Sequence, residues 1–232
     1  FSQGDPKLYR TLFTRDCVRN RRSFEAGGAR YNWAVVSYHG IANCIDGLAA
    51  IRACVYERGT VAPADLAAAV RSNFEGFEPL RQELLAAPKF GNDDPAVDEL
   101  GRNVVQYAWR RLYQHETPRG GRYLPSCILF VTYFGAGLAT GATPDGRRTG
   151  EVLTDSIGPA QGRDTTGPTA MLNSVTKLPL WLAVGTPVLN LRLSAELMRG
   201  EDGLQAVVSL VRGYFAAGGL HVVGTPPNVH LG

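Results

Sequence analysis

Three short stretches of the sequence place polar and charged side chains directly beside glycines. These stretches are GGARYN (residues 27–32), FGNDDP (90–95) and GATPDGR (141–147). Glycine lets the backbone approach another element closely. Amide, phenol, carboxylate and guanidinium groups in such places can hydrogen-bond a small molecule. The three stretches are therefore the candidates for a binding site.

FGNDDP also has a partly structural explanation. Asp94 stands directly before Pro95, where its carboxylate can cap a helix that Pro95 opens. This role leaves Asn92, which can also turn the chain, and Asp93 without an evident structural function. GGARYN has the same two interpretations, either a turn from a helix end into a strand or part of a site.

GATPDGR is more elaborate than a surface turn requires. Its glycines permit close backbone approach, and Asp145 and Arg147 can form charge-assisted hydrogen bonds to neighbouring segments or to each other. A pair of opposite charges so near a turn usually satisfies itself or the nearby backbone, so we favour a structural role for this stretch.

Several other functions are excluded by the sequence. The net charge of +3 is spread along the chain, without the basic stripe of a nucleic-acid site. GAGLATG resembles a dinucleotide fingerprint, but its sixth position is Thr140 and no helix pattern follows. The four histidines are scattered singly, and no cysteine pair has metal-site spacing. No apolar run is long enough to span a membrane.

The first half of the chain has the periodicity of helices. We expect helices over 6–22, 41–58, 63–74, 78–87 and 95–112. The helix over 41–58 would place Cys44 and Cys54 on its inward side, which predicts buried and unreactive thiols.

The second half changes character. YLPSCILFVTYF (123–134) is rich in β-branched and aromatic residues and predicts a buried strand. An irregular stretch over 135–167 follows, and a loop of that length usually has a function. We then expect a helix over 169–178, a strand over 187–194, a helix over 202–218 capped by Asp202, and a strand over 220–225. This order favours an α/β or α+β fold.

The order of eight sequence blocks resembles the glycyl radical enzymes, a family that includes pyruvate formate-lyase. The blocks are GGARYNW, GIANCIDGLAAI, NFEGFEPLR, APKFGNDDPAVDEL, GATPDGRRTGE, GRDTTGPTAMLNSV, PVLNLRLS and GYFAAGGLHV. They are most similar to the branch of diol, glycerol and hydroxyproline dehydratases and choline trimethylamine-lyase. The resemblance implies an α/β fold, namely part of a ten-stranded barrel surrounded by helices.

The resemblance also implies a radical mechanism and its partners. In the family, an activating enzyme with S-adenosylmethionine and an iron–sulfur cluster installs a glycyl radical, which generates a cysteine thiyl radical that attacks the substrate. The chain contains neither the thiyl cysteine loop nor the radical glycine motif. We therefore expect a cytoplasmic fragment that binds no cofactor or metal itself and is inactive alone. The alternative is a non-catalytic remnant or partner subunit that associates through the half-barrel surface.

The same resemblance sets the expected boundaries and site. Residues 1–222 would be a partial pyruvate formate-lyase-like domain, and 223–232 a divergent tail. The expected partners are a small-molecule substrate, the activating enzyme and the missing N- and C-terminal segments. A homodimer is a further possibility. The candidates for walls of the substrate cavity are, in order of preference, Tyr31 and Asn32, then Asn92 and Asp93, then Asp145 and Arg147.

Overall fold

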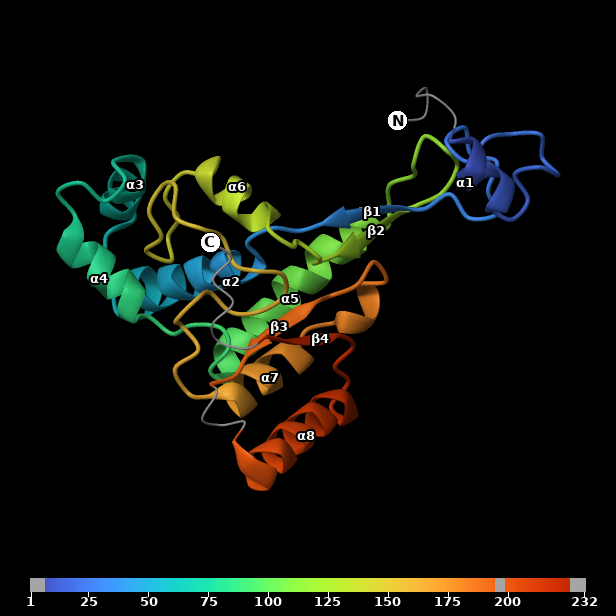
Figure 1. Ribbon diagram of the computed structural model, residues 1–232. Coiled ribbons are helices and arrows are strands. Elements are labelled where there is room, and N and C mark those ends of the chain that lie inside the picture. Colours follow the sequence, from blue (N-terminus) through green and yellow to red (C-terminus); the bar gives the residue numbers. More distant parts are fainter. Residues whose placement is uncertain (1–6, 195–198, 226–232) are drawn as a thin grey trace.

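Four short parallel strands run through the centre of the computed structural model (Figure 1). Strand β1 (Ala34–Ser37) pairs with β2 (Tyr123–Ser126), with Ala34 opposite Tyr123. Strand β3 (Leu189–Arg192) pairs with β4 (Val222–Thr225), with Leu189 opposite Val222. Each pair is parallel because long helical connections return the chain to the same end of the sheet.

The two strand pairs are joined where β2 ends. Cys127 and Pro187 form an isolated parallel bridge, and the Ser126 hydroxyl donates to the Gly185 carbonyl at 2.6 Å. A Cβ on Gly185 would lie 2.9 Å from the Cβ of Ser126, so only glycine allows this approach. The four strands therefore follow one another in chain order, β1 to β4.

Eight α-helices surround these strands within the described residues, which are 7–194 and 199–225. They are α1 (Leu8–Phe13), α2 (Ile41–Ala50), α3 (Pro63–Arg71), α4 (Glu78–Ala86), α5 (Pro95–Leu112), α6 (Thr132–Leu138), α7 (Pro168–Thr176) and α8 (Gly200–Ala216). A π-helical segment (Ile51–Glu57) continues α2, and a 3₁₀ turn (Leu180–Leu182) follows α7. None of the helices in these ranges is long and apolar enough to cross a membrane.

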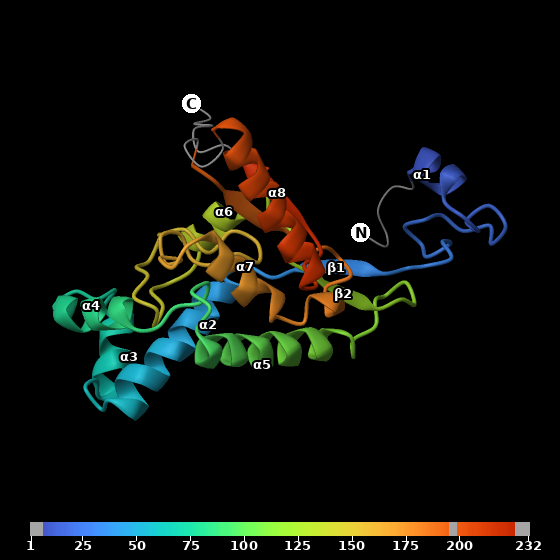
Figure 2. The ribbon, with the colours of Figure 1, turned by 90° about the horizontal axis from the view of Figure 1, so that it is seen from below.

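The main core lies between the strands and helices α2, α5, α7 and α8 (Figure 2). Trp109 of α5 and Tyr214 of α8 are among its largest buried side chains. Strand β3 contributes Leu189 and Leu191 to this core, whereas Arg192 lies on the opposite, exposed side. The α/β class expected from the sequence is thus confirmed, with helices packed on one face of a parallel strand array.

Helix α5 begins as the sequence predicts. Asp94 is its N-cap, and the carboxylate accepts hydrogen bonds from the backbone N–H groups of Ala96 at 2.9 Å and Val97 at 3.3 Å. Pro95 occupies the first helical position, where its missing N–H group removes no helical hydrogen bond.

The strand expected over 123–134 is wrong beyond Ser126. β2 ends at that residue, and Phe130 adopts a left-handed backbone conformation with φ of 51°. The Thr132 hydroxyl donates to the Leu129 carbonyl at 2.6 Å, and the chain continues into α6. Residues with a high strand propensity therefore form a turn and a helix because tertiary packing overrides that propensity.

Three smaller expectations also differ from the structure. The helix expected over 6–22 is limited to α1 within the described residues. Asp202 lies in the first turn of α8 but does not cap it, because the cap position is Arg199 and carries no side-chain hydrogen bond. Cys54 is buried as expected, whereas Cys44 is exposed.

Helix α6 contains a close backbone contact that predicts a strong difference between two glycines. A Cβ on Gly137 would lie 2.5 Å from the Glu151 carbonyl oxygen, whereas one on Gly135 meets nothing within 4 Å. We expect Gly137→Ala to lower the free energy of unfolding by about 2 kcal/mol through overpacking. Gly135→Ala should instead raise it by roughly 0.5 kcal/mol, since alanine favours the helix. Urea unfolding measures both, and equal effects at the two positions would contradict this packing.

Candidate functional site

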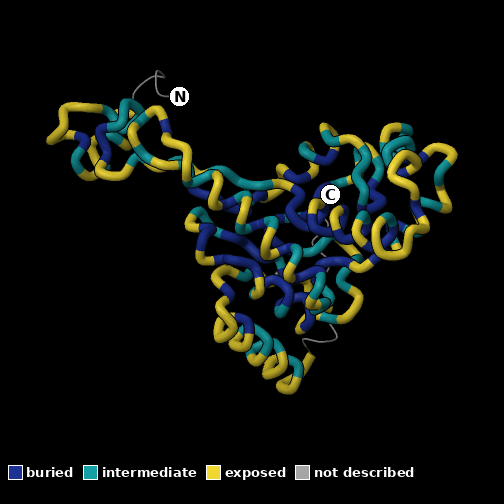
Figure 3. Tube along the Cα trace, turned by 180° about the vertical axis from the view of Figure 1, so that it is seen from behind, coloured by how far each residue is buried: buried dark blue, intermediate teal, exposed yellow. Residues whose placement is uncertain are grey.

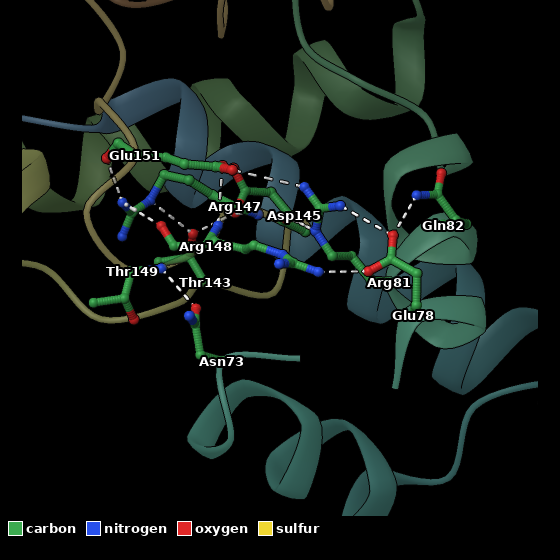
Figure 4. Close-up of polar contacts among 11 residues, drawn as sticks. Asn73, Glu78, Arg81, Gln82, Thr143, Asp145, Arg147, Arg148, Thr149 and Glu151 are labelled. Atoms are coloured by element: carbon green, nitrogen blue, oxygen red, sulfur yellow. Dashed lines mark hydrogen bonds and ion pairs between the residues drawn. The ribbon is translucent and has the colours of Figure 1, made fainter. Parts of the chain in front are cut away.

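The GATPDGR loop is organised around Arg147, which is buried together with Asp145 (Figure 4). The Arg147 guanidinium donates to four backbone carbonyls and one hydroxyl of its own loop. The acceptors are the carbonyls of Thr140, Gly141, Arg148 and Glu151 and the hydroxyl of Thr143. Burial lowers the pKa of Arg147 from its usual value, and nearby Asp145 opposes this shift. The side chain thus fixes an irregular loop whose carbonyls would otherwise lack partners.

Asp145 connects the same loop to α2. Its carboxylate accepts from the Asn43 amide at 2.8 Å and from the Thr143 hydroxyl, and the Asn43 oxygen accepts from the Thr154 N–H at 2.8 Å. Within the described residues Asp145 and Arg147 form no side-chain ion pair. Arg147 is instead engaged by the nearby backbone, which is the other outcome expected for this pair, and its own backbone N–H donates to the Asp145 carboxylate at 3.4 Å. These contacts support the structural interpretation of the loop.

The outer side of the loop is fastened to α4. Arg148 pairs with Glu78 at 2.7 Å, and Arg81 pairs with the same carboxylate at 3.1 Å. Arg81 also donates to the Gly146 carbonyl at 2.8 Å (Figure 4). Hydrogen bonds, led by those from Gln82 and Arg148, hold the pKa of Glu78 below its usual range. The loop therefore bridges α2 and α4.

Asn92 fastens a second loop. Its side-chain oxygen accepts from the N–H groups of Thr165 at 2.8 Å and Thr166 at 3.0 Å, and its nitrogen donates to the carbonyls of Lys89 at 3.2 Å and Arg163 at 2.8 Å. The amide thus joins FGNDDP to the loop that precedes α7. This is a structural function that the sequence interpretation missed.

Asp93 likewise has structural partners. Its backbone is left-handed, with φ of 59°, and its N–H donates to the Ser174 hydroxyl at 2.9 Å. The carboxylate accepts from Asn173 at 2.8 Å and pairs with Lys177, which also pairs with the buried Asp98 at 2.7 Å. Lys177, followed by Asn173, holds the pKa of Asp93 below its usual value. Asn92 and Asp93 therefore do not lack a structural role.

Tyr31 and Asn32 lie on an N-terminal arm that extends from the rest of the chain (Figure 1, Figure 3). Tyr31 is 66% exposed, and its ring centroid lies 5.3 Å from that of Trp33. Asn32 donates to the carbonyls of Gly27 at 3.2 Å and Ala29 at 3.0 Å. The structure therefore does not bring these two residues together with the other four candidates.

A cleft of about 380 Å³ with polar and apolar lining opens beside β3. We call it the β3 cleft and define it by Asp155, Asp164, Met171, Asn190 and Arg192. It lies between β3, the loop before α7 and the start of α7. In α/β proteins, ligands bind at the carboxyl ends of parallel strands, which is where this cleft opens.

The β3 cleft offers hydrogen-bonding groups of both kinds. Asp155 accepts from Asn190 at 2.8 Å and from the Ser156 hydroxyl at 2.9 Å. The Arg192 guanidinium lies beside the Tyr133 hydroxyl, whose pKa is raised by burial. Burial also raises the pKa of Asp164. In the described part of the chain, no group of three or more His, Cys, Asp or Glu side chains could hold a metal ion.

Asn190 and Arg192 were not among the candidates expected from the sequence, although the sequence carries a signal for them. In VLNLRLS (188–194), leucines alternate with asparagine, arginine and serine. A parallel strand buried on both faces reads as a continuous apolar run, whereas this alternation indicates one polar face. Leu189 and Leu191 are indeed buried, and Asn190 and Arg192 line the cleft.

Comparisons with known proteins agree along most of the chain. Residues 3–137 match the family model described as pyruvate formate lyase-like, and residues 153–225 match the glycine radical model. A probable dehydratase, YbiW, of Escherichia coli (strain K12) is 37% identical over 86% of this chain and 26% of its own length. The (2S)-3-sulfopropanediol dehydratase of Klebsiella oxytoca is 33% identical over 94% of this chain and 27% of its own.

Solved structures give the same result. The glycerol-bound B12-independent glycerol dehydratase from Clostridium butyricum superposes with a TM-score of 0.89 at 33% identity, over 94% of this chain and 28% of that one. A structure described for 1,2-propanediol dehydration in Roseburia inulinivorans gives 0.90 at 34% identity, with the same coverage. The chain spans about a quarter of the length of the relatives it matches. It belongs to the pyruvate formate lyase-like family of glycyl radical enzymes.

Proposed function

We propose that this chain is part of a glycyl radical enzyme that cleaves a C–O, C–N or C–C bond of a small molecule, and that it is inactive alone. The observation that carries the proposal is the succession of two family matches along one chain, the second of them to a glycine radical model. The relatives named above are dehydratases, which favours cleavage of a C–O bond. Radical generation would be the task of an activating enzyme acting on the complete protein in the cytoplasm.

In this proposal the chain supplies a wall of the substrate cavity. The β3 cleft is the best candidate wall, because Asn190 and Arg192 present polar groups on the side of β3 that the helices leave open. Asp155 would hold Asn190 in place through the 2.8 Å hydrogen bond. The cleft replaces GGARYN as the preferred site, and the four strands would form part of the family's ten-stranded barrel.

Asn92, Asp93, Asp145 and Arg147 have a supporting role in this proposal. They hold the two long loops that flank the strands, and their hydrogen-bonding groups are engaged by the protein. Tyr31 is the exception among the original candidates, since its exposed ring is free to contact a further segment. The division of the chain after residue 222 also stays a prediction. Strand β4 crosses that boundary, and residues 226–232 of the expected tail lie outside the described residues.

The test compares this 232-residue chain with the same chain translated in frame with its own flanking coding sequence. Both are incubated anaerobically with S-adenosylmethionine and an activating enzyme, and EPR is recorded. We expect the doublet of a glycyl radical from the longer product only. A doublet from the short chain would contradict its inactivity. The absence of a doublet from both would reject the enzyme and favour a non-catalytic partner subunit.

A further inference from the structure

A second cleft, of about 390 Å³, lies between α2, the GATPDGR loop and the loop before α7. We call it the α2 cleft and define it by Asn43, Asp145, Arg147, Thr154 and Arg163. The first four of these residues are buried to 94% or more. Burying polar side chains is costly unless they are hydrogen-bonded, so the unpaired polar groups of this cleft indicate which ligand it could bind.

Two groups that line the α2 cleft have no protein partner in the described ranges. The Thr154 hydroxyl is buried without a hydrogen bond, although the residue is only 1% exposed. The guanidinium of Arg163 has neither a hydrogen bond nor an ion pair there, and only its backbone is engaged. Both groups can donate hydrogen bonds, and burying an unsatisfied hydroxyl costs about 1–3 kcal/mol.

The charges around the α2 cleft leave an excess of positive charge. Asp145 faces the cationic Arg147, and Glu151 at the rim lies 3.8 Å from Arg81. Arg163 forms no ion pair in the described residues, but the buried Asp46 and Lys89 both lie close enough to interact with it, and burial lowers the pKa of Lys89.

Two further features strengthen the positive potential of the α2 cleft. Asp46 carries the carboxyl that interacts with Arg163. Burial raises the pKa of this carboxyl to about 7, so it is only partly ionised at neutral pH. Asn43 is the third residue of the ten-residue helix α2, and the N-terminus of a helix attracts negative charge.

We propose that the α2 cleft binds an oxyanion, a phosphate or carboxylate group carried by a small molecule. Arg163 supplies the charge and Thr154 a hydrogen bond, while Asp145 and Arg147 hold the floor in place. Gln161 lines both this cleft and the β3 cleft, so an occupant here would contact the loop that also borders the β3 cleft. This inference concerns a site separate from the β3 cleft and does not require radical chemistry.

The test measures binding of inorganic phosphate, acetate and choline to the 232-residue chain at pH 7 by NMR titration. We expect phosphate or acetate to bind with a Kd below about 10 mM, and choline not to bind. Tighter binding of phosphate would identify a phosphoryl group, and tighter binding of acetate a carboxylate. Binding of neither anion, or of choline equally well, would overturn the proposal.

Variants locate the binding. Arg163→Gln and Thr154→Val should each raise the Kd at least fivefold, and Arg163→Lys should retain part of the affinity. Arg102→Gln changes an exposed arginine on α5 and is the matched control with an unchanged Kd. Far-UV circular dichroism verifies that each variant is folded. A Kd that is the same in Arg163→Gln and Arg102→Gln would show that the anion binds elsewhere, which also overturns the proposal.

Discussion

Replacement of Arg147 by lysine is expected to lower the free energy of unfolding by about 3 kcal/mol although the charge is retained. The guanidinium donates to four carbonyls and the Thr143 hydroxyl. A lysine ammonium has three donors on a flexible stem and cannot reach the same set of acceptors. Carbonyls of the loop would then be buried without partners. Urea unfolding gives the change in free energy.

Arg148→Lys is the matched control. This neighbouring side chain is half-buried, and its ion pair with Glu78 is solvent-accessible, so its replacement should change stability by less than about 1 kcal/mol. Hydrogen exchange adds a local measurement. The amides of Thr143 and Gly146 donate within the loop and should exchange faster in Arg147→Lys only. Similar losses of stability in the two variants would show that Arg147 does not organise the loop.

The second large effect concerns Asp46, which is fully buried. One carboxylate oxygen accepts the Phe90 N–H at 2.7 Å and the other has no partner in the described residues. Burial raises the pKa of this carboxyl from 3.8 to about 7. Between these values the unfolded chain has lost the proton while the folded protein retains it, so stability falls as the pH rises from about 4 to about 7.

Asp46→Asn should remove this dependence. The amide oxygen can still accept the Phe90 N–H, and position 46 carries no charge at any pH. At pH 8 we expect the variant to be more stable than the wild type by up to roughly 4 kcal/mol, and near pH 4 the difference should vanish. Unfolding curves across this pH range provide the measurement.

Asp65→Asn serves as the control for Asp46→Asn, because Asp65 is an exposed carboxylate on α3. It should follow the wild-type curve at every pH. The explanation through Asp46 fails if the Asp46→Asn curve has the same slope as the wild type.

Local sequence patterns predicted the helices well. Helices α3, α4, α5 and α7 occur where the apolar periodicity places them, and Asp94 caps α5. Such features depend on residues within one or two turns of each other, and the sequence displays these directly. The long irregular stretch before α7 was also anticipated, although its first residues belong to α6.

The roles of the polar residues could not be predicted in the same way. The side-chain oxygen of Asn92 meets the Thr165 N–H 73 residues later, and the Asp93 carboxylate meets Asn173 80 residues later. No local pattern reveals such partners, so the sequence alone left these side chains as candidates for contact with a substrate. Asn190 and Arg192 of the β3 cleft could have been predicted, because polar residues alternate with leucines in this strand and indicate one polar face.

Strands β1 and β2 can pair only after the chain between them has become compact. The Ser37 hydroxyl of β1 donates to the Ile128 carbonyl just past β2, across 91 residues of chain. Closing so long a loop has a large entropic cost before any contact compensates it, and proteins rich in distant contacts refold slowly, in milliseconds to seconds. The unit of β3, α8 and β4 needs a much shorter closure. Refolding should therefore start in this C-terminal unit, and the docking of β1 on β2 should limit the overall rate of refolding.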